Sequence, residues 1–530
     1  MIELAVGVRS ELPDSWVTAA IGEIATLSPK FIATDIDVAD PVHFVPMAAV
    51  AEDFGGIDVS QVRPYGEVRK GYTYFAEQDV LFAKITPCME NGKGALVPYL
   101  KHDHAFGSTE FHVLRPQGAV RPKWLANYLS QPDFRRVARH NMTGTAGQLR
   151  VSTKWLGLAG IPVPPLAEQD RIVEKLEELL SDLDAGVAEL KAAQCKLARY
   201  RQSLLKAAVE GALTAEWRKS RTLTPTPLPG GEGQKQESGA VLLQRILTER
   251  RTRWEQKQLA KFASQGKPPP QGWQSKYSDP VAPDTTDLPS LPEGWTWATV
   301  DQLSLVQKYG SSAKTNEDSA GIPVLRMGNI QEGELDLGKL KYLPRSHDEF
   351  PDLFLEDGDL LFNRTNSPEL VGKTAVFRSQ IMPYSYASYL IGVRISPRCS
   401  PDFVSAYINS TYGRQWVKSV VTQQVGQANV NGSKLAALAV PLPPECEQSE
   451  ITRRLVEQRQ AGFEQEAMVA RGIKQAAAQR KNILKAAFAG QLVPQDPNDE
   501  PASSLLERIR ANRTSKAAPK LRDGKARKSA

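Results

Sequence analysis

Two polar loops carry side chains that are well suited to contact a ligand. The first reads Thr143-Gly-Thr-Ala-Gly-Gln148-Leu-Arg150, and the second reads Thr422-Gln-Gln-Val-Gly-Gln-Ala-Asn429. Backbone N–H groups and hydroxyls in such loops position phosphates. Gln or Asn can form two hydrogen bonds with adenine, and Arg can do the same with guanine. The residue types therefore predict recognition of nucleic acid at both loops.

The alternative interpretation is that both loops are structural turns. Gln148 and Gln427 both follow the glycine of their loop. Residues that read two different base sequences should differ, so this identity favours a role in which each glutamine binds the backbone of its own loop. Arg150 and Asn429 do differ. A third pair, Lys84 and Arg364, stands at the ends of two predicted strands, where phosphate contact and a solvated edge charge are equally good interpretations.

A basic segment surrounds the first loop. Between Arg121 and Lys154 there are seven basic residues and one acidic residue, so this stretch could face phosphates. The complete set of candidate contact residues is Lys84, Lys93, Arg135, Arg136, Arg139, Thr143, Thr145, Gln148 and Arg150 in the first half, and Asn363, Arg364, Lys373, Arg414, Lys418, Gln423, Gln424, Gln427 and Asn429 in the second.

Motifs of catalysis and metal binding are missing from the sequence. Val371-Gly-Lys-Thr374 resembles the end of a phosphate-binding loop, but Ser367 stands where that loop needs a glycine. His102 and His104 could form half of a metal site, yet neither HExxH nor paired CxxC completes it. Signatures of dinucleotide binding, amino-methyl transfer, nucleases and serine hydrolases are also absent. We therefore predict no catalytic residue, no metal and no cofactor in this chain.

The sequence contains two copies of one module, separated by 279 or 280 residues. An offset that stays constant over some two hundred residues does not arise by chance. Between the matched segments the two copies differ strongly in sequence, and such a difference would suit recognition of two different sites. The matched segments are Leu12-Pro-x-x-Trp16 with Leu291-Pro-x-x-Trp295, Asp79-Val-Leu-Phe82 with Asp359-Leu-Leu-Phe362, Pro162-x-Pro-Pro-x-x-Glu-Gln169 with Pro441-x-Pro-Pro-x-x-Glu-Gln448, and Leu205-Lys-Ala-Ala208 with Leu484-Lys-Ala-Ala487.

Each copy ends in a long heptad helix. Apolar residues seven apart predict a coiled-coil seam. In the first helix we expect the alternate seam position to be filled by Ile172, Leu179, Gly186, Ala193, Tyr200 and Ala207. The second seam has smaller residues, such as Gly462 and Ala476, so large-against-small packing between the two helices is expected. Separate packing of each helix on its own domain is the alternative. The pairing residues are Leu176, Leu183, Leu190, Leu197 and Leu204 in the first helix, and Leu455, Val469 and Ile483 in the second.

The globular part of each copy mixes strands and helices, which predicts an α+β fold. Strands are expected at 72–75, 79–85, 108–114 and 359–365, and helices at 123–140 and 401–420. The predicted organisation is a domain at 1–165, a long helix at 166–215, a Pro-rich linker at 216–290 with a basic helix at about 238–263, a second domain at 291–444, a second long helix at 445–493, and a short helix with a basic tail at 494–530.

Charge and composition narrow the class of protein. The 530 residues carry a formal charge of +6, but residues 503–530 alone hold nine basic and two acidic residues, so the rest is close to neutral. No apolar run is long enough to cross a bilayer. Four widely spaced cysteines indicate a reducing compartment. We expect a cytoplasmic protein of a bacterial or archaeal cell.

The twofold plan, the Pro-x-Pro-Pro-x-x-Glu-Gln sequence before each long helix and the Leu-Lys-Ala-Ala ending resemble the specificity subunit of Type I restriction–modification systems. The resemblance implies two target-recognition domains, joined by an antiparallel pair of helices, that each read half of a bipartite, asymmetric DNA site. It further implies two methyltransferase subunits and restriction subunits as partners. S-adenosylmethionine, ATP and Mg would be bound by those partners, and this chain would catalyse nothing.

Other functions stay open at this point. A stand-alone DNA-binding regulator would bind without methyltransferase partners, and a coiled-coil adaptor would recruit proteins without reading DNA. An unrecognised nuclease or methyltransferase is a further alternative. The long connection at 222–289 and the basic tail depart from the family's compact plan, so the sequence leaves their roles and the closure of the two chain ends open.

Overall fold

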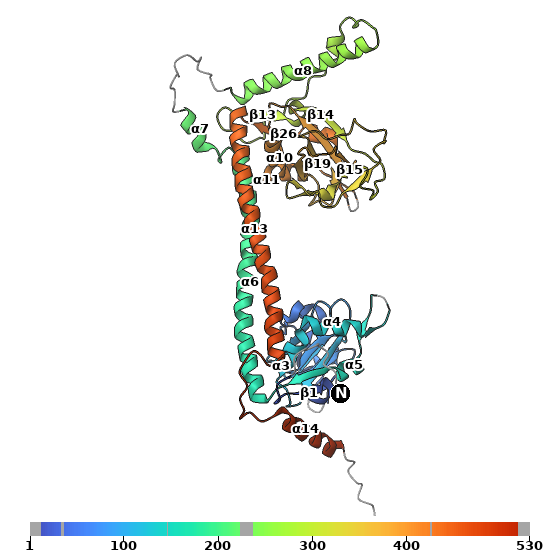
Figure 1. Ribbon diagram of the computed structural model, residues 1–530, viewed down its shortest axis with the longest axis vertical. Coiled ribbons are helices and arrows are strands. Elements are labelled where there is room, and N and C mark those ends of the chain that lie inside the picture. The colour runs from blue at the N-terminus through green and yellow to red at the C-terminus, as the bar shows by residue number, and fades with distance from the viewer. Residues whose placement is uncertain (1–11, 33–35, 146, 223–236, 425–426, 518–530) are drawn as a thin grey trace, which may run out of the picture. The chain divides into compact units, whose positions relative to one another are not determined.

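The computed structural model describes residues 12–32, 36–145, 147–222, 237–424 and 427–517. The chain divides into two compact units, Met1–Lys191 with Ala470–Ala530, and Ala192–Val469. Each unit contains one globular domain together with parts of both long helices (Figure 1). Residues 223–236 of the predicted linker at 216–290, and the tail beyond residue 517, lie outside the described residues.

The first domain is built around two four-stranded sheets. The antiparallel sheet has the order β2-β9-β6-β7, and the mixed sheet has the order β4-β3-β8-β5, in which β3 and β8 are parallel. Their strands are β2 (Ala25–Leu27), β3 (Pro41–Val45), β4 (Val62–Pro64), β5 (Thr73–Phe75), β6 (Val80–Ala83), β7 (Gly94–Leu96), β8 (Ala105–Gly107) and β9 (Phe111–Pro116). The buried strands β6 and β9 form the centre of the core.

The second domain repeats this plan. Its sheets have the orders β14-β23-β19-β21 and β18-β15-β22, again with one parallel pair, β15 and β22. The strands are β14 (Ser304–Tyr309), β15 (Ile322–Leu325), β18 (Lys341–Leu343), β19 (Leu360–Asn363), β21 (Thr374–Val376), β22 (Ser385–Tyr386) and β23 (Leu390–Ile395). The shared strand order shows that the repeat in the sequence is a repeat of fold.

Shorter elements complete both domains. Two equivalent antiparallel ladders, β1 with β12 and β13 with β26, join the start of each domain to the strand before its long helix. These elements are β1 (Val17–Ala20), α1 (Ile21–Ile24), α2 (Tyr65–Val68), β10 (Met142–Thr143), β11 (Arg150–Val151), α5 (Thr153–Leu158), β12 (Gly160–Val163), β13 (Thr296–Thr299), α9 (Val300–Leu303), β16 (Ile330–Gln331), β17 (Glu334–Leu335), β20 (Thr365–Asn366), β24 (Thr422–Gln424), β25 (Gln427–Asn429), α12 (Gly432–Ala436) and β26 (Ala439–Leu442).

The single helix expected in each domain is two helices, so that prediction is corrected. The first domain has α3 (Pro122–Ser130) and α4 (Pro132–His140), because Pro132 lacks the N–H needed to continue α3. The second has α10 (Pro401–Asn409) and α11 (Thr411–Val420), which break at the extended residue Ser410.

The long helices α6 (Leu166–Val209) and α13 (Glu445–Phe488) have 44 residues each, or about 65 Å. They pair in both units. In the first unit Leu190 of α6 lies against Gly472 of α13, and in the second the Tyr200 hydroxyl donates to Gln458 Oε1 at 2.8 Å. The start of each helix meets the end of the other, so the pair is antiparallel. The predicted fold class is confirmed.

The seam follows the expected register only in part. Leu179 and Ala193 are half-buried, as expected, but Gly186 and Tyr200 are exposed. Val187 and Arg201 are half-buried in their place, so the seam departs from the expected register at these two positions. Arg201 forms an ion pair with Glu466 inside this seam. Among the predicted pairing residues, Leu176, Leu204 and Leu455 are buried, and Leu183, Leu190, Leu197, Val469 and Ile483 are half-buried.

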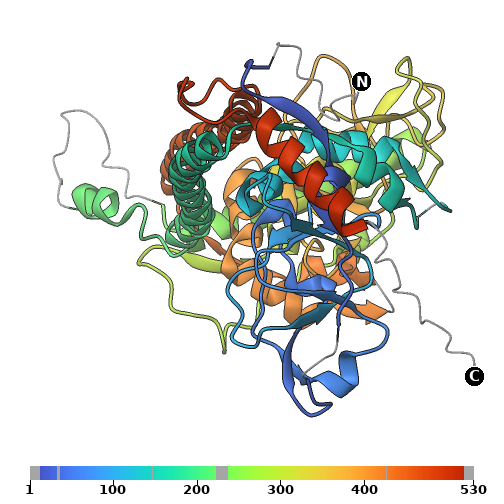
Figure 2. The ribbon, with the colours of Figure 1, turned by 90° about the horizontal axis from the view of Figure 1, so that it is seen from below.

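Helices that follow the long helices return to the domains. In the second unit α7 (Ala215–Thr222) and α8 (Gly239–Ser264) follow α6, and Leu242 and Ile246 of α8 join the core of the second domain. In the first unit α14 (Ala502–Ala517) follows α13, and its residues Ala502 and Leu506 join the core of the first domain (Figure 2). Each domain core is thus completed by a distant stretch of chain.

The start of each domain is also fixed to the start of its own long helix. Trp16 Nε1 donates to Glu168 Oε2 at 3.0 Å, and Trp295 Nε1 donates to Glu447 Oε2 at 2.9 Å. Burial raises the pKa of the Glu168 carboxyl. The shared Trp and Glu-Gln motifs of the repeat therefore have a structural role. Among the described helices, none combines the length and the apolar character needed to cross a membrane.

Candidate nucleic-acid interface

In the first domain, the loop that follows β6 is held between β9 and the β10–β11 hairpin. Lys84 N donates to Glu110 O at 2.9 Å, and Val151 N donates to Lys84 O at 2.8 Å. Thr86 N donates to Leu149 O at 3.1 Å. These backbone bonds bring the side chains of Lys84, Glu110 and Arg150 to one place, which we call the first strand-end site.

The second domain builds the same frame with other side chains. Arg364 N donates to Tyr389 O at 3.0 Å, and Val430 N donates to Arg364 O at 2.9 Å. Arg364, Tyr389 and Asn429 therefore correspond to the three residues of the first strand-end site, and we call them the second strand-end site. One backbone arrangement thus presents two different sets of functional groups.

An ion pair orients the first strand-end site. Arg150 Nε donates to Glu110 Oε2 at 3.0 Å and Arg150 Nη2 to Glu110 Oε1 at 2.9 Å. The guanidinium of Arg150 holds the pKa of the Glu110 carboxyl below its ordinary value, so the pair is charged at neutral pH. Lys84 makes no ion pair with any described residue. The site therefore offers a positioned guanidinium, a carboxylate and an available ammonium group.

Aromatic rings and an amide characterise the second strand-end site. The guanidinium carbon of Arg364 lies 4.8 Å from the ring centroid of Tyr309. Asn429 Nδ2 donates to Thr365 Oγ1 at 2.9 Å, which leaves its carbonyl oxygen and one amide hydrogen for other partners. Tyr389 is 50% exposed. This site differs from the first in charge, shape and hydrogen-bonding pattern.

The prediction for Asn363 is wrong. Asn363 is 1% exposed, and its Nδ2 donates to Leu370 O at 3.2 Å, so the side chain lies inside the domain. It is the last residue of β19, a strand whose residues are all buried. The prediction that Asn363 lies near a strand end is right. The sequence pattern did not indicate that its side chain is buried.

The β10–β11 hairpin exposes the hydroxyls that the sequence singled out. Thr143, Thr145 and Gln148 are all exposed, and the Gln148 amide has no hydrogen-bond partner among the described residues. An exposed Gln148 is compatible with contact to a ligand, and its role in nucleic-acid binding stays a prediction. The side chains of Gln423, Gln424 and Gln427, in the matching hairpin, lie outside the described residues.

The cations of α4 are engaged within the first domain. Arg135 Nη2 lies 2.8 Å from Asp53 Oδ1, and its side chain is only 11% exposed. The remaining basic candidates near α4 also have acceptors in the same unit. Arg136 pairs with Asp133 at 2.8 Å, Arg139 with Glu90 at 3.2 Å, and Lys93 Nζ donates to Met47 O at 3.2 Å. The guanidinium of Arg135 therefore has a structural role in holding α4, and its contact with DNA stays a prediction.

The equivalent cations of the second domain lie near a long helix. Arg414 Nη1 donates to Val371 O at 2.6 Å and Arg414 Nη2 to Glu369 O at 2.7 Å, so Arg414 also holds its helix in place, and its contact with DNA stays a prediction. Lys373, Arg414 and Lys418 line one surface pocket together with Arg201 and Gln202 of α6. The helical candidates are therefore separate from the strand-end sites.

Polar contacts also fix the strands that lead to each site. Arg115 binds Asp79 through two hydrogen bonds of 2.7 Å, and Arg394 binds the equivalent Asp359 through two of 2.8 Å. His112, on β9 of the first domain, is buried with Nε2 2.8 Å from Val151 O, and burial lowers its pKa. His112 therefore holds β11 in place as a neutral donor.

Sequence reasoning missed Glu110, Tyr309 and Tyr389. Glu110 and Tyr389 are 279 residues apart, so the repeat offset could have paired them, but neither residue belongs to a recognisable motif. In the described part of the chain, no group of His, Cys, Asp and Glu is arranged to hold a metal ion. No disulfide joins any two of the four cysteines, all of which lie in that part of the chain.

Comparisons with known proteins agree on one family. Residues 13–191 match the family model for the Type I restriction modification DNA specificity domain. The Type I restriction enzyme EcoEI specificity subunit of Escherichia coli is 28% identical over 491 residues, which cover 83% of this chain and 77% of that protein. The EcoKI specificity subunit of Escherichia coli strain K12 is 26% identical over 529 residues, covering 96% of this chain and 98% of that protein.

A solved structure supports the same fold. One chain of a structure described as the basis of complex assembly and conformational transition of the type I R-M system has a TM-score of 0.59 and 19% sequence identity. The match covers 91% of this chain and 100% of that chain. The chain therefore carries a Type I restriction modification DNA specificity domain at residues 13–191, and its similarity to Type I restriction enzyme specificity subunits extends over both copies of the repeat.

Proposed function

We propose that this protein recognises a bipartite DNA sequence and directs methylation and restriction by partner subunits. The observation that carries the proposal is the pair of strand-end sites, in which one backbone frame holds Lys84, Glu110 and Arg150 in one domain and different residues in the other. Equivalent frames with unlike side chains suit the reading of two different half-sites. The asymmetry of the target would then follow from the asymmetry of these side chains.

The residues have distinct roles in this proposal. Arg150, oriented by Glu110 and the Gln148 carbonyl, would donate two hydrogen bonds to guanine through its remaining N–H groups. Asn429 would pair with adenine. Lys84 and Arg364 supply charge for phosphates, which position the protein without reading sequence. The exposed hydroxyls of Thr143 and Thr145 add further phosphate contacts.

In this proposal the partner subunits, and not this chain, catalyse methylation and DNA cleavage. The proposed assembly contains two methyltransferase subunits, which bind S-adenosylmethionine and methylate adenine, and restriction subunits, which use ATP and Mg. This chain would supply the target sequence and the docking surface. The exposure of the long helices supports this role, because in each unit most residues of the paired segments outside the seam are exposed and are therefore open to partners.

Exchange of one domain tests the proposal. Residues 12–160 would be replaced by those of a relative with a known target, and methylated motifs would be mapped by sequencing the methylome of cells that also make the modification subunit. We expect one half of the motif to change and the other to stay the same. The matched control replaces the corresponding residues 291–439 and should change only the other half. A change in both halves would contradict independent reading.

Two rival functions are tested in the same cells. A stand-alone regulator would bind its DNA equally well without modification subunits, and an adaptor would recruit proteins but show no sequence preference. Co-purification with the modification subunit, followed by DNA binding with and without that subunit, separates both from the proposed role.

A further inference from the structure

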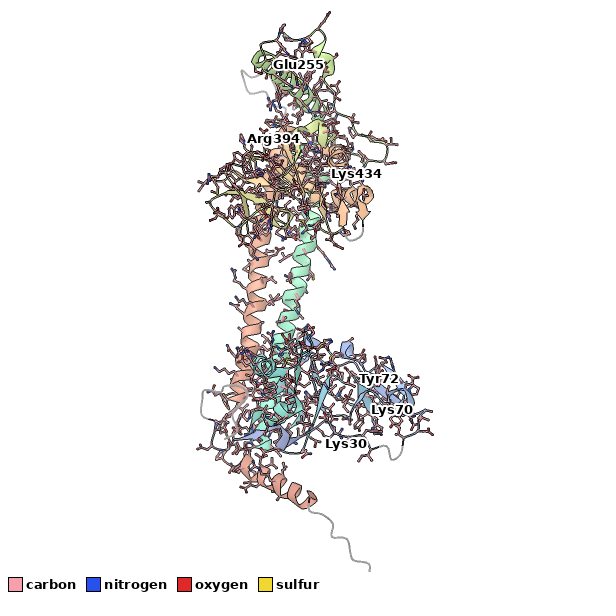
Figure 3. The ribbon with its side chains drawn as sticks, turned by 90° about the vertical axis from the view of Figure 1, so that its right-hand side faces the viewer. Lys30, Lys70, Tyr72, Glu255, Arg394 and Lys434 are labelled. Carbon is pink, nitrogen blue, oxygen red and sulfur yellow. The ribbon has the colours of Figure 1, made fainter. Side chains whose placement is uncertain are left out.

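The helix α8 extends well past the domain on which it begins. Leu242 and Ile246, near its N-terminus, are buried in the second domain. Beyond Arg250 the helix leaves the domain, and Figure 1 shows this part projecting away from the strands of the same unit. Glu255 marks the projecting part in Figure 3, apart from Arg394 and Lys434 of the domain. We call residues 250–277 the arm.

Aromatic packing holds the arm in a defined shape. Trp254 of α8 stacks on Trp273 with ring centroids 5.8 Å apart, and Phe262 meets the edge of Trp273 at 6.0 Å. Tyr277 lies 5.3 Å from Trp254. The chain after α8 therefore folds back along one side of the helix, and the aromatic rings are used internally. An arm tied in this way can present side chains at fixed positions.

A row of cations lies beside this aromatic contact. Arg253, Lys257 and Lys261 are exposed, and none has an ion-pair partner among the described residues. Their spacing of four residues places them on one face of the helix. Arg253 and Lys257 follow Ile246 by seven and eleven residues, so they continue the face that is buried lower down. The helix dipole favours a cation at Lys261 but does not account for the other two.

The charge of the arm is one-sided. Residues 250–277 contain seven Lys or Arg and one Asp or Glu. That single acid, Glu255, is paired with Arg251 at 3.2 Å, while Arg250 is paired with Asp301 of the domain at 2.9 Å. Glu255 and Asp301 are thus both in ion pairs with other arginines. Arg253, Lys257 and Lys261 therefore remain available to bind an external anion. Neighbouring Lys267 and Lys276 are exposed as well.

We infer that the arm binds phosphates of duplex DNA next to the half-site read by the second domain. This inference rests on the proposed function. Three cations at intervals of about 6 Å along a helix span about 12 Å, the rise of between three and four base pairs. The centres of protein interfaces are poor in Lys and rich in aromatic residues, and here the aromatic rings face inward. The exposed chemistry of the arm therefore fits a phosphate backbone and not a protein partner.

The test uses the full chain assembled with its modification subunits. The variant Arg253→Gln, Lys257→Gln, Lys261→Gln would be compared with the wild type on two duplexes that contain the mapped motif. One duplex extends about 3 base pairs beyond the second half-site, and the other about 15. We expect the variant to bind the long duplex at least tenfold more weakly than the wild type, and the short duplex equally well. On the long duplex the slope of log K against log salt concentration should fall by about 2 to 3.

Two control variants check the cause. Arg253→Lys, Lys257→Arg, Lys261→Arg keeps the charge and should bind as the wild type does. Thr252→Ala, Gln256→Ala changes exposed, uncharged residues on another face of the same helix and should also have no effect. Circular dichroism and partner assembly of every variant would be measured in parallel.

The possible failures are distinguishable. Equal salt slopes for the wild type and the charge-removing variant on the long duplex would overturn the inference. Weaker assembly with the modification subunits, with unchanged DNA binding by the complexes that form, would also overturn it and identify an acidic protein surface as the partner. Failure of the wild-type complex to prefer its motif would instead count against the proposed function.

Discussion

The strand-end sites show how a residue can be recognised as a candidate before its surroundings are known. Lys84, Arg150, Arg364 and Asn429 could be predicted from residue type and from their place in the repeat. Glu110 and Tyr389 could not, because they reach the sites through strand pairing between segments far apart in sequence. Asn363 failed as a prediction for a related reason, since burial depends on the neighbouring elements and not on the residue itself.

His112 makes the first domain sensitive to acid. Burial lowers its pKa below the ordinary value of 6.5, so the unfolded chain takes up this proton more readily than the folded domain. Its contribution to stability is therefore full above pH 6.5 and is lost as the pH falls below that value. We expect His112→Gln, which retains a donor for Val151 O, to lose stability less steeply than the wild type between pH 7 and pH 5.

The measurement is the melting temperature of both proteins across that pH range. The second domain has Ile391 at the equivalent position, so it supplies no matching titration. A wild-type pH profile that the substitution leaves unchanged would show that other groups set the acid sensitivity.

At the scale of elements, the spacing of apolar residues predicted the helices better than the helix propensity of individual residues did. The heptad pattern located both long helices, because few structures besides a paired helix require an apolar repeat over so many turns. It did not decide on which side of the leucines the seam continues, since residues three or four positions away are both adjacent on a helix. The break within each pair of domain helices followed from local features, namely Pro132 in one domain and the extended Ser410 in the other.

Close packing of the two long helices leads to a prediction at Gly472. A Cβ atom there would lie 3.1 Å from Leu190 Cδ1, so a large side chain would force the helices apart. We expect Gly472→Leu to destabilise the pair by about 1 to 3 kcal/mol, as overpacking usually does. Gly462→Leu is the matched control, because no heavy atom lies within 4 Å of an added Cβ at that glycine. Chemical denaturation would measure both variants, and equal effects would show that helix propensity alone is responsible.

At the scale of the whole molecule, the long helices are candidates for a ruler. If they set the separation of the two half-sites, lengthening both should lengthen the unread spacer in the DNA target. Four residues inserted after Leu190 and four beside Gly472 add about 6 Å to the pair. DNA rises about 3.4 Å per base pair, so we expect the spacer to grow by one or two base pairs with both half-sites unchanged.

Methylome sequencing of cells that carry the lengthened protein would measure the spacer. Insertion in one helix alone is the control and should abolish methylation, because it shifts one side of the seam against the other. A fully active double insertion with the original spacer would exclude the ruler and leave the helices as a docking surface.

The return of α14 to the first domain has a consequence for synthesis on the ribosome. The core of that domain contains Phe488, whose ring centroid lies 4.3 Å from that of Trp124, and Leu506 of α14. At 5 to 20 residues per second, these late residues emerge roughly 15 to 70 seconds after residue 165. The buried apolar residues that pack on the second domain, by contrast, end at Leu455, which lies in one cluster with Trp295 and Phe403. The domain that is translated first is therefore the last to be completed, and a nascent chain stopped before Phe488 would leave it open.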